Sequence, residues 1–220
     1  MTTSEQADCR PLRADAERNR LRIIAAAREL FAQRGLEVTM DDVAAHAGVG
    51  VGTVYRRFTN RDELIEGIFV EHLNTVRTHL QASLDNPDSW DGLVDLLTFM
   101  GQTMAADRGL AAIMMRIDHT APVIEAAKEK MTQGMQDVIE RARASGVIRP
   151  DFAPTDMFLM FNMVCTCADI TETTVPGAWR RSLEMLLDSM RADGRRVPLT
   201  TPPLTVEQIH AAQSARCRTR

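Results

Sequence analysis

The stretch Thr39–Phe58, TMDDVAAHAGVGVGTVYRRF, predicts two short helices on either side of a glycine. Thr39 can cap the first helix, and Asp42, three residues on, gives an acidic form of the capping box. The apolar residues of this helix share one face: Val43, Ala44 and Ala47. Gly48 follows where a left-handed turn residue is needed, a conformation that glycine adopts without strain.

The second helix is expected to begin near Gly50–Val51 and to end at Phe58, with Val54 and Phe58 facing inward. Its other face carries small residues, a tyrosine and an arginine, and no acidic side chain: Val51, Gly52, Tyr55 and Arg56. A helix with such a face is suited to approach phosphates and base edges. The stretch therefore predicts a helix-turn-helix that reads DNA.

Residues 18–64 closely resemble the DNA-reading helix-turn-helix of the tetracycline-repressor (TetR) family. The run AGVGVGTVYRRFTNRDEL, in register with a preceding amphipathic helix, carries the resemblance. Matching residues outside the motif are Ile23, Ala27, Leu30, Phe31, Gly35, Asn60, Arg61, Asp62 and Leu64. Beyond Leu64 the resemblance is architectural only, because the effector domains of this family diverge freely.

The resemblance implies a role for each matched position. Val51, Gly52 and Arg56 match positions that commonly meet bases, and an arginine can bind guanine O6 and N7 with two hydrogen bonds. Phosphate-contacting positions are matched by Thr39, Thr53, Tyr55, Arg57 and Arg61. Gly50 stands where the family often has a capping serine, so water or a DNA phosphate is expected to satisfy the free N–H groups there.

Charge is divided unevenly along the 220 residues, although the formal net charge is only −4. Residues 10–61 hold 10 Arg against 6 acidic residues, and residues 195–220 hold 5 Arg against Glu207. Each segment therefore carries +4, which leaves −12 for the rest of the chain. Such a division predicts that the N-terminal module meets a polyanion, with random charge scatter as the alternative.

The order of breakers and apolar stripes predicts an all-α chain of four parts. Residues 1–15 form a flexible arm, in which Arg10 and Arg13 can touch DNA. Residues 16–62 form the DNA-binding domain, which begins with a helix over 16–34. Arg18, Arg20 and Arg22 lie in that helix, either as a solvated face or, by resemblance, near a phosphate. Residues 63–194 form a helical domain to which the resemblance assigns effector binding and dimerisation, and residues 195–220 are a tail containing Pro and Arg.

A connecting helix is expected from a cap at Asn60, with Glu63 completing a second capping box, to about Leu84. Further helices are expected over 89–106, 109–118, 121–144, 154–173 and 177–192, with no strands. The helix at 154–173 is apolar around much of its circumference and must be buried on two sides. The helices at 154–173 and 177–192 can be buried on their second side by another subunit, in a dimer. The alternative is a monomer in which both helices belong to the core.

The resemblance assigns the last two helices to a homodimer interface. The residues predicted there are Met157, Val164, Ala168, Trp179, Leu183, Leu186 and Met190. An apolar effector pocket is predicted from the resemblance and from the high methionine content, because methionine packs adaptably, although such residues can also be plain core. Its predicted lining is Phe69, Leu97, Met100, Met104, Met114, Met131, Met135 and Phe161.

Cys165 and Cys167 are two residues apart on a helix, so their thiols point roughly 200° apart and cannot easily share a metal ion. No nucleophile–base pair, phosphate loop or metal cluster suggests an enzyme, and no cofactor is expected. The sequence shows no secretory signal or membrane-spanning run, which predicts a cytoplasmic protein with reduced thiols.

The resemblance, together with these patterns, implies a ligand-responsive transcriptional regulator. In this interpretation a homodimeric repressor binds a palindromic double-stranded DNA operator and is released by a small, largely apolar effector. A helical small-molecule-binding protein with a vestigial DNA-binding head is the alternative.

Overall fold

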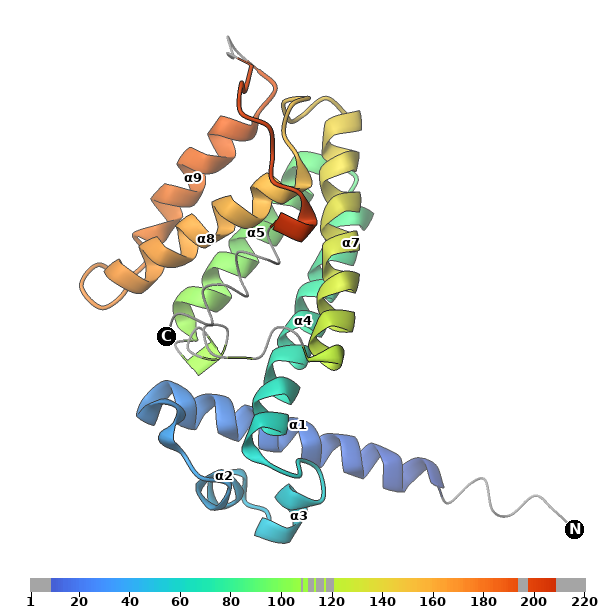
Figure 1. Ribbon diagram of the computed structural model, residues 1–220, viewed down its shortest axis with the longest axis vertical. Coiled ribbons are helices and arrows are strands. Elements are labelled where there is room, and N and C mark those ends of the chain that lie inside the picture. The colour runs from blue at the N-terminus through green and yellow to red at the C-terminus, as the bar shows by residue number, and fades with distance from the viewer. Residues whose placement is uncertain are drawn as a thin grey trace, which may run out of the picture. The chain divides into compact units, whose positions relative to one another are not determined.

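The structure, a computed structural model, describes residues 9–107, 109–110, 113, 117, 121–193 and 198–208. Within these ranges every regular segment is a helix, and the sole β-type pairing is an isolated antiparallel bridge between Ile148 and Arg191 (Figure 1). The predicted all-α fold class is confirmed. Among the described helices, none is long and apolar enough to cross a membrane.

The chain forms two compact units. One holds the chain up to Phe69 together with Arg108–Ile117, and the other holds Val70–Asp107 together with Asp118–Arg220. Helix α4 (Arg61–Asp85) contributes residues to both units, and its bounds lie within one residue of those expected. The segment after α5 was expected in the effector domain, yet it groups with the DNA-reading helices. The predicted domain boundaries stay predictions.

The first unit contains α1 (Cys9–Arg34), the 3₁₀ turn η1 (Gly35–Glu37), α2 (Met40–Ala47) and α3 (Val51–Tyr55). Helix α1 packs against α2 through a face that is almost fully buried: Ile23, Ala27, Leu30 and Phe31. It begins at Cys9 rather than at residue 16. Pro11 does not prevent the earlier start, because a proline in the first turn removes no intrahelical hydrogen bond.

The second unit contains α5 (Ser89–Ala106), α7 (Pro122–Ala144), α8 (Pro154–Thr171) and α9 (Trp179–Met190). All four lie within two residues of the expected ranges. Helix α5 packs against the other three and is central to the core (Figure 1). Its N-cap is Asp88, whose Oδ1 accepts hydrogen bonds from the backbone N–H groups of Trp90 and Asp91 at 2.8 and 3.0 Å.

The helix expected over 109–118 lies largely outside the described residues. Gly109, Leu110 and Ile113 are helical, and Leu110, Ile113 and Ile117 are buried within the first unit. These residues thus extend the hydrophobic core around α1.

Candidate nucleic-acid interface and effector region

Local structure defines both ends of α2. The backbone N–H of Asp42 donates to Thr39 Oγ1 at 3.1 Å, and the backbone N–H of Thr39 donates to Asp42 Oδ2 at 3.0 Å. The capping box is therefore confirmed. Hydrogen bonds from the side chain and backbone of Thr39 lower the pKa of Asp42. Gly48 ends α2 with a φ of 64°, in the predicted left-handed conformation.

Helix α3 begins at Val51, and Gly50 precedes it without a side-chain cap, as expected. It ends at Tyr55, three residues before the predicted end at Phe58. The backbone N–H of Arg57 reaches the carbonyl of Val54, three residues back, at 2.9 Å, so the helix tightens there. This turn brings the Phe58 ring into the core, where both Val54 and Phe58 are buried as predicted.

The outer face of α3, together with the turn that follows it, is open to solvent and carries two arginines. Val51, Gly52, Tyr55, Arg56 and Arg57 are all exposed. A β-carbon on Gly52 would meet nothing within 4 Å, so the backbone there can be approached closely. Arg56 Nη2 donates a hydrogen bond to Thr53 Oγ1 at 3.0 Å, which orients the guanidinium along the helix. These five members of the predicted DNA-contacting set are therefore accessible to solvent, and their contact with DNA stays a prediction.

The start of α4 differs slightly from the prediction. The backbone N–H of Glu63 donates to Asn60 Oδ1 at 2.8 Å, as expected for a cap. The Glu63 carboxylate, however, accepts from the backbone N–H of Thr59 at 2.6 Å, one residue earlier than expected. Arg61 is half-buried at the first position of α4, and its Nε atom has no hydrogen-bond partner in the described structure. Its contact with phosphate stays a prediction.

Arg18, Arg20 and Arg22, which the sequence grouped together on α1, differ in their partners. Arg18 pairs with Asp15, and Arg20 Nη1 lies 3.2 Å from Glu17 Oε1; both acids are on the same helix. Arg22 instead reaches α2, where its Nη2 donates to the carbonyl oxygen of Ala47 at 2.8 Å.

The predicted dimer-interface residues mostly face the core of their own chain. Six are buried within it: Met157, Val164, Ala168, Trp179, Leu183 and Met190. Leu186 is half-buried against the same core. The apolar side chains that α8, α9 and the loop between them leave exposed are others: Leu159, Met163, Ile170, Val175 and Met185. Helix α8 is thus buried on one side and exposes apolar side chains on the other, where the sequence predicted burial on both sides. The residues predicted for the dimer interface lie on its inner face, and burial of its outer face by a partner stays a prediction.

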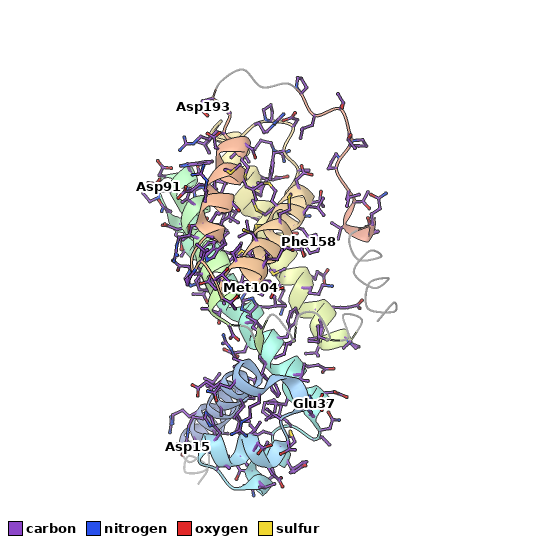
Figure 2. The ribbon with its side chains drawn as sticks, turned by 90° about the vertical axis from the view of Figure 1, so that its left-hand side faces the viewer. Asp15, Glu37, Asp91, Met104, Phe158 and Asp193 are labelled. Atoms are coloured by element: carbon purple, nitrogen blue, oxygen red, sulfur yellow. The ribbon has the colours of Figure 1, made fainter. Side chains whose placement is uncertain are left out.

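The predicted effector-pocket residues divide between the two units. Phe69 belongs to the first unit, and Met114 lies outside the described residues. In the second unit Leu97, Met100 and Met104 are buried, and Met131, Met135 and Phe161 are partly buried against the same core. Figure 2 labels Met104 on α5 and Phe158 on α8. The buried and partly buried residues of the second unit thus make an apolar, methionine-rich interior.

A small apolar cavity lies among α5, α8 and α9, with Leu97, Phe161, Met157 and Met190 among its lining residues. Its volume is about 10 Å³, comparable with the space that one water molecule needs. A drug-sized ligand requires several hundred Å³. Side chains of the interior would therefore have to move to admit an effector there.

Cys165, Cys167 and His79 of the second unit are engaged in packing or hydrogen bonding within the protein. Burial raises the pKa of Cys165 to about 12, and Cys167 Sγ accepts a hydrogen bond from Ser182 Oγ at 3.2 Å. His79 stacks on Phe99 with ring centroids 3.4 Å apart. Within the described ranges, no group of three or more His, Cys, Asp or Glu side chains could hold a metal ion.

Two family models match the chain. The one described as bacterial regulatory proteins, tetR family, matches residues 23–68, and the one described as the C-terminal domain of SbtR-like transcriptional regulators matches residues 88–192. An HTH-type transcriptional regulator from Staphylococcus aureus (strain USA300) is 34% identical over 76 residues, which is 34% of this chain. That alignment spans only 41% of the relative's own length.

Solved structures with the same fold cover most of the chain. A TetR transcription regulatory protein from Mycobacterium vanbaalenii is 26% identical, with a TM-score of 0.64 over 82% of this chain and 99% of that one. FadR from Bacillus subtilis, in complex with stearoyl-CoA, is 17% identical with a TM-score of 0.62 over 78% of this chain and 99% of that one. SmeT, in complex with triclosan, is 22% identical with a TM-score of 0.60 over 85% and 99%.

Proposed function

Because the chain belongs to the TetR family of transcriptional regulators, we propose that it is a repressor that binds a palindromic operator as a homodimer. A small, largely apolar effector releases it from the DNA. The observation that carries this proposal is the outer face of α3, which is open, flat at Gly52 and free of acidic side chains.

Operator binding requires contacts to bases and contacts to phosphates, and this face offers side chains suited to each. Arg56 presents donors that can pair with guanine, and Thr53 holds its guanidinium at 3.0 Å. The exposed phenol of Tyr55 and the guanidinium of Arg57 lie beside it, where they suit phosphate oxygens. Together these groups supply both base reading and sequence-independent attraction.

Homodimerisation is supported by the exposed apolar surface of Leu159, Met163, Ile170, Val175 and Met185, which we name the outer α8–α9 face. Met163, Ile170 and Met185 are 54%, 69% and 65% exposed, a poor arrangement for large apolar side chains unless a partner covers them. A second copy burying this face against its own would make a two-fold dimer. Such symmetry places two recognition helices in successive major grooves, about 34–36 Å apart.

The effector is proposed to be apolar because the interior of the second unit is apolar and rich in methionine. FadR with stearoyl-CoA and SmeT with triclosan share the fold, and both ligands have large apolar parts. Methionine side chains can repack around such a ligand at low cost. The effector is therefore expected to open space near Met100 and Met104 rather than enter a large preformed cavity.

Coupling between effector and DNA is supported by the segment that follows α5. Helix α5 ends at Ala106 in the second unit, and the next residues, from Arg108, belong to the first unit. Gly109 lies so close to α1 that a β-carbon would be 2.8 Å from the carbonyl oxygen of Arg28. A shift of α5 caused by effector binding would therefore be passed through the chain to α1.

A gel-shift assay tests this function, using DNA from beside the gene for this chain at several salt concentrations. The proposal expects a discrete complex whose affinity falls with salt and survives competition by random DNA. A helical small-molecule-binding protein with a vestigial head would show no preference for that DNA. This second outcome would reject the regulator in favour of a binding protein.

A further inference from the structure

Arg22 joins two helices of the first unit. It lies on α1, and its Nη2 atom donates a partly buried hydrogen bond to the carbonyl oxygen of Ala47, the last residue of α2, at 2.8 Å. The two residues are 25 positions apart in the chain. The bond therefore fastens α1 to the end of α2, immediately before the turn.

The Ala47 carbonyl needs a partner from elsewhere. The last carbonyl groups of a helix have no intrahelical donor. The backbone N–H of Gly48 donates to the Ala44 and Ala45 carbonyls, and that of Val49 donates to Ala44 at 3.0 Å. The guanidinium of Arg22 is the donor to the Ala47 carbonyl oxygen, and its positive charge interacts favourably with the negative end of the α2 dipole.

This bond bears on how α3 is held. The turn residue Gly48 directly follows Ala47, and α3 begins at Val51. Arg22 Nη2 also lies 3.5 Å from the position that a β-carbon on Gly48 would occupy. We infer that Arg22 is a positioning residue for sequence reading, which holds the turn so that α3 meets the bases at a fixed angle, rather than a phosphate contact.

The inference rests on the proposed DNA-binding function, and the same helix offers a matched control. Arg18 is one helical turn earlier and carries the same charge, but its partner Asp15 is on α1 itself. Its side chain is 66% exposed. Loss of Arg18 removes one positive charge without freeing the turn.

Amide hydrogen exchange of the free protein tests the bond without DNA. Arg22→Met keeps the aliphatic stem and removes every donor. We expect exchange at Val49 to become about tenfold faster, since a hydrogen bond to a charged group is lost, and to stay unchanged in Arg18→Met. Unchanged exchange at Val49 in Arg22→Met would overturn the inference, whether or not a specific DNA site exists.

Affinity for DNA tests the role in reading. The operator is a duplex selected by the unmodified protein from a random pool, and a shuffled duplex is the comparison. We expect Arg22→Met to lose about tenfold in operator affinity with the salt dependence unchanged and the shuffled duplex little affected. A uniform loss on both duplexes, with the slope of log affinity against log salt reduced by about one, would show a phosphate contact and overturn the inference.

Arg22→Lys is the second variant if Arg22→Met does not fold. It keeps the charge, but the lysine side chain is one atom shorter and its ammonium does not reach the position from which Arg22 Nη2 donates to Ala47. The inference expects the same pattern with a smaller loss: faster exchange at Val49 and lower operator affinity at an unchanged salt slope. Equal behaviour of Arg22→Lys and the unmodified protein in both assays would overturn it.

Discussion

Gly109 lies against the backbone of Arg28, and a β-carbon at Gly109 would come within 2.8 Å of that residue's carbonyl oxygen. It would also come within 2.8 Å of the backbone nitrogen of Ala32. Neither backbone atom can move aside as a flexible side chain does. The segment after α5 is thus held tightly against α1 within the first unit.

Gly109→Ala is therefore expected to destabilise the first unit by about 1–3 kcal/mol, as overpacking does in other cores. Denaturant unfolding followed by circular dichroism measures the loss. Gly35→Ala is a poor control, because Gly35 has a positive φ of 71°. Gly52→Ala is the matched control, because nothing lies within 4 Å of a β-carbon added at Gly52. Unchanged stability of Gly109→Ala would mean that α1 and the segment separate easily.

Gly52→Ala should affect stability and DNA affinity in opposite directions. Nothing lies within 4 Å of the added methyl group, and alanine favours a helix over glycine by up to about 1 kcal/mol. The protein should therefore unfold at equal or higher denaturant concentration. Its operator affinity should fall, because the methyl group keeps the backbone away from the base edges. Unchanged affinity on the operator would place Gly52 outside the DNA contact.

Arg56→Ala should weaken operator binding by about 1–3 kcal/mol and relax the preference at one base position. Tyr55→Phe removes a hydroxyl suited to phosphate and should weaken binding to operator and random duplex alike. Competition assays against a set of single-base operator variants distinguish the two. If Arg56→Ala weakened binding to every variant equally, Arg56 would be a phosphate contact.

Met163→Glu and Ile170→Glu should each convert the dimer to a folded monomer, because both side chains are exposed on the outer α8–α9 face. Val164→Asp is the matched contrast, since Val164 is a neighbour on α8 that is buried in the core. It should unfold the chain, because a buried unpaired carboxylate is costly. Light scattering after size exclusion gives the mass, and circular dichroism reports folding. A native monomer of the unmodified protein at micromolar concentration would rule out this dimer.

The local features of the reading head could be predicted from sequence because each depends on neighbours in the chain. The two partners of the Thr39–Asp42 box are three positions apart, and a glycine such as Gly48 itself indicates a left-handed turn. The faces of α8 could not be assigned this way. Val164 and Met163 are adjacent and both apolar, so only packing of α8 against α5 and α9 decides that Val164 is inside.

Contacts between residues far apart in the chain could not be predicted from the sequence either, because the packing of the fold decides them. Arg18, Arg20 and Arg22 form one basic cluster in the sequence, yet Arg22 bonds the end of α2 while Arg18 and Arg20 pair with acids on α1. Gly109 reads as a helix breaker, and its contact with α1 depends on the fold bringing residues about 80 positions apart together. The effector residues were inferred from composition and resemblance, and these cannot specify which methionines move.

Operator affinity with and without an effector tests the central claim most directly. A small apolar ligand that raises the melting temperature of the protein, and that Met104→Trp no longer binds, is added at saturation during a fluorescence anisotropy titration of labelled operator. We expect weaker operator binding. A 100-fold loss would equal about 2.7 kcal/mol of coupling, and DNA would then weaken ligand binding by the same factor. Operator affinity unchanged at ligand saturation would contradict it.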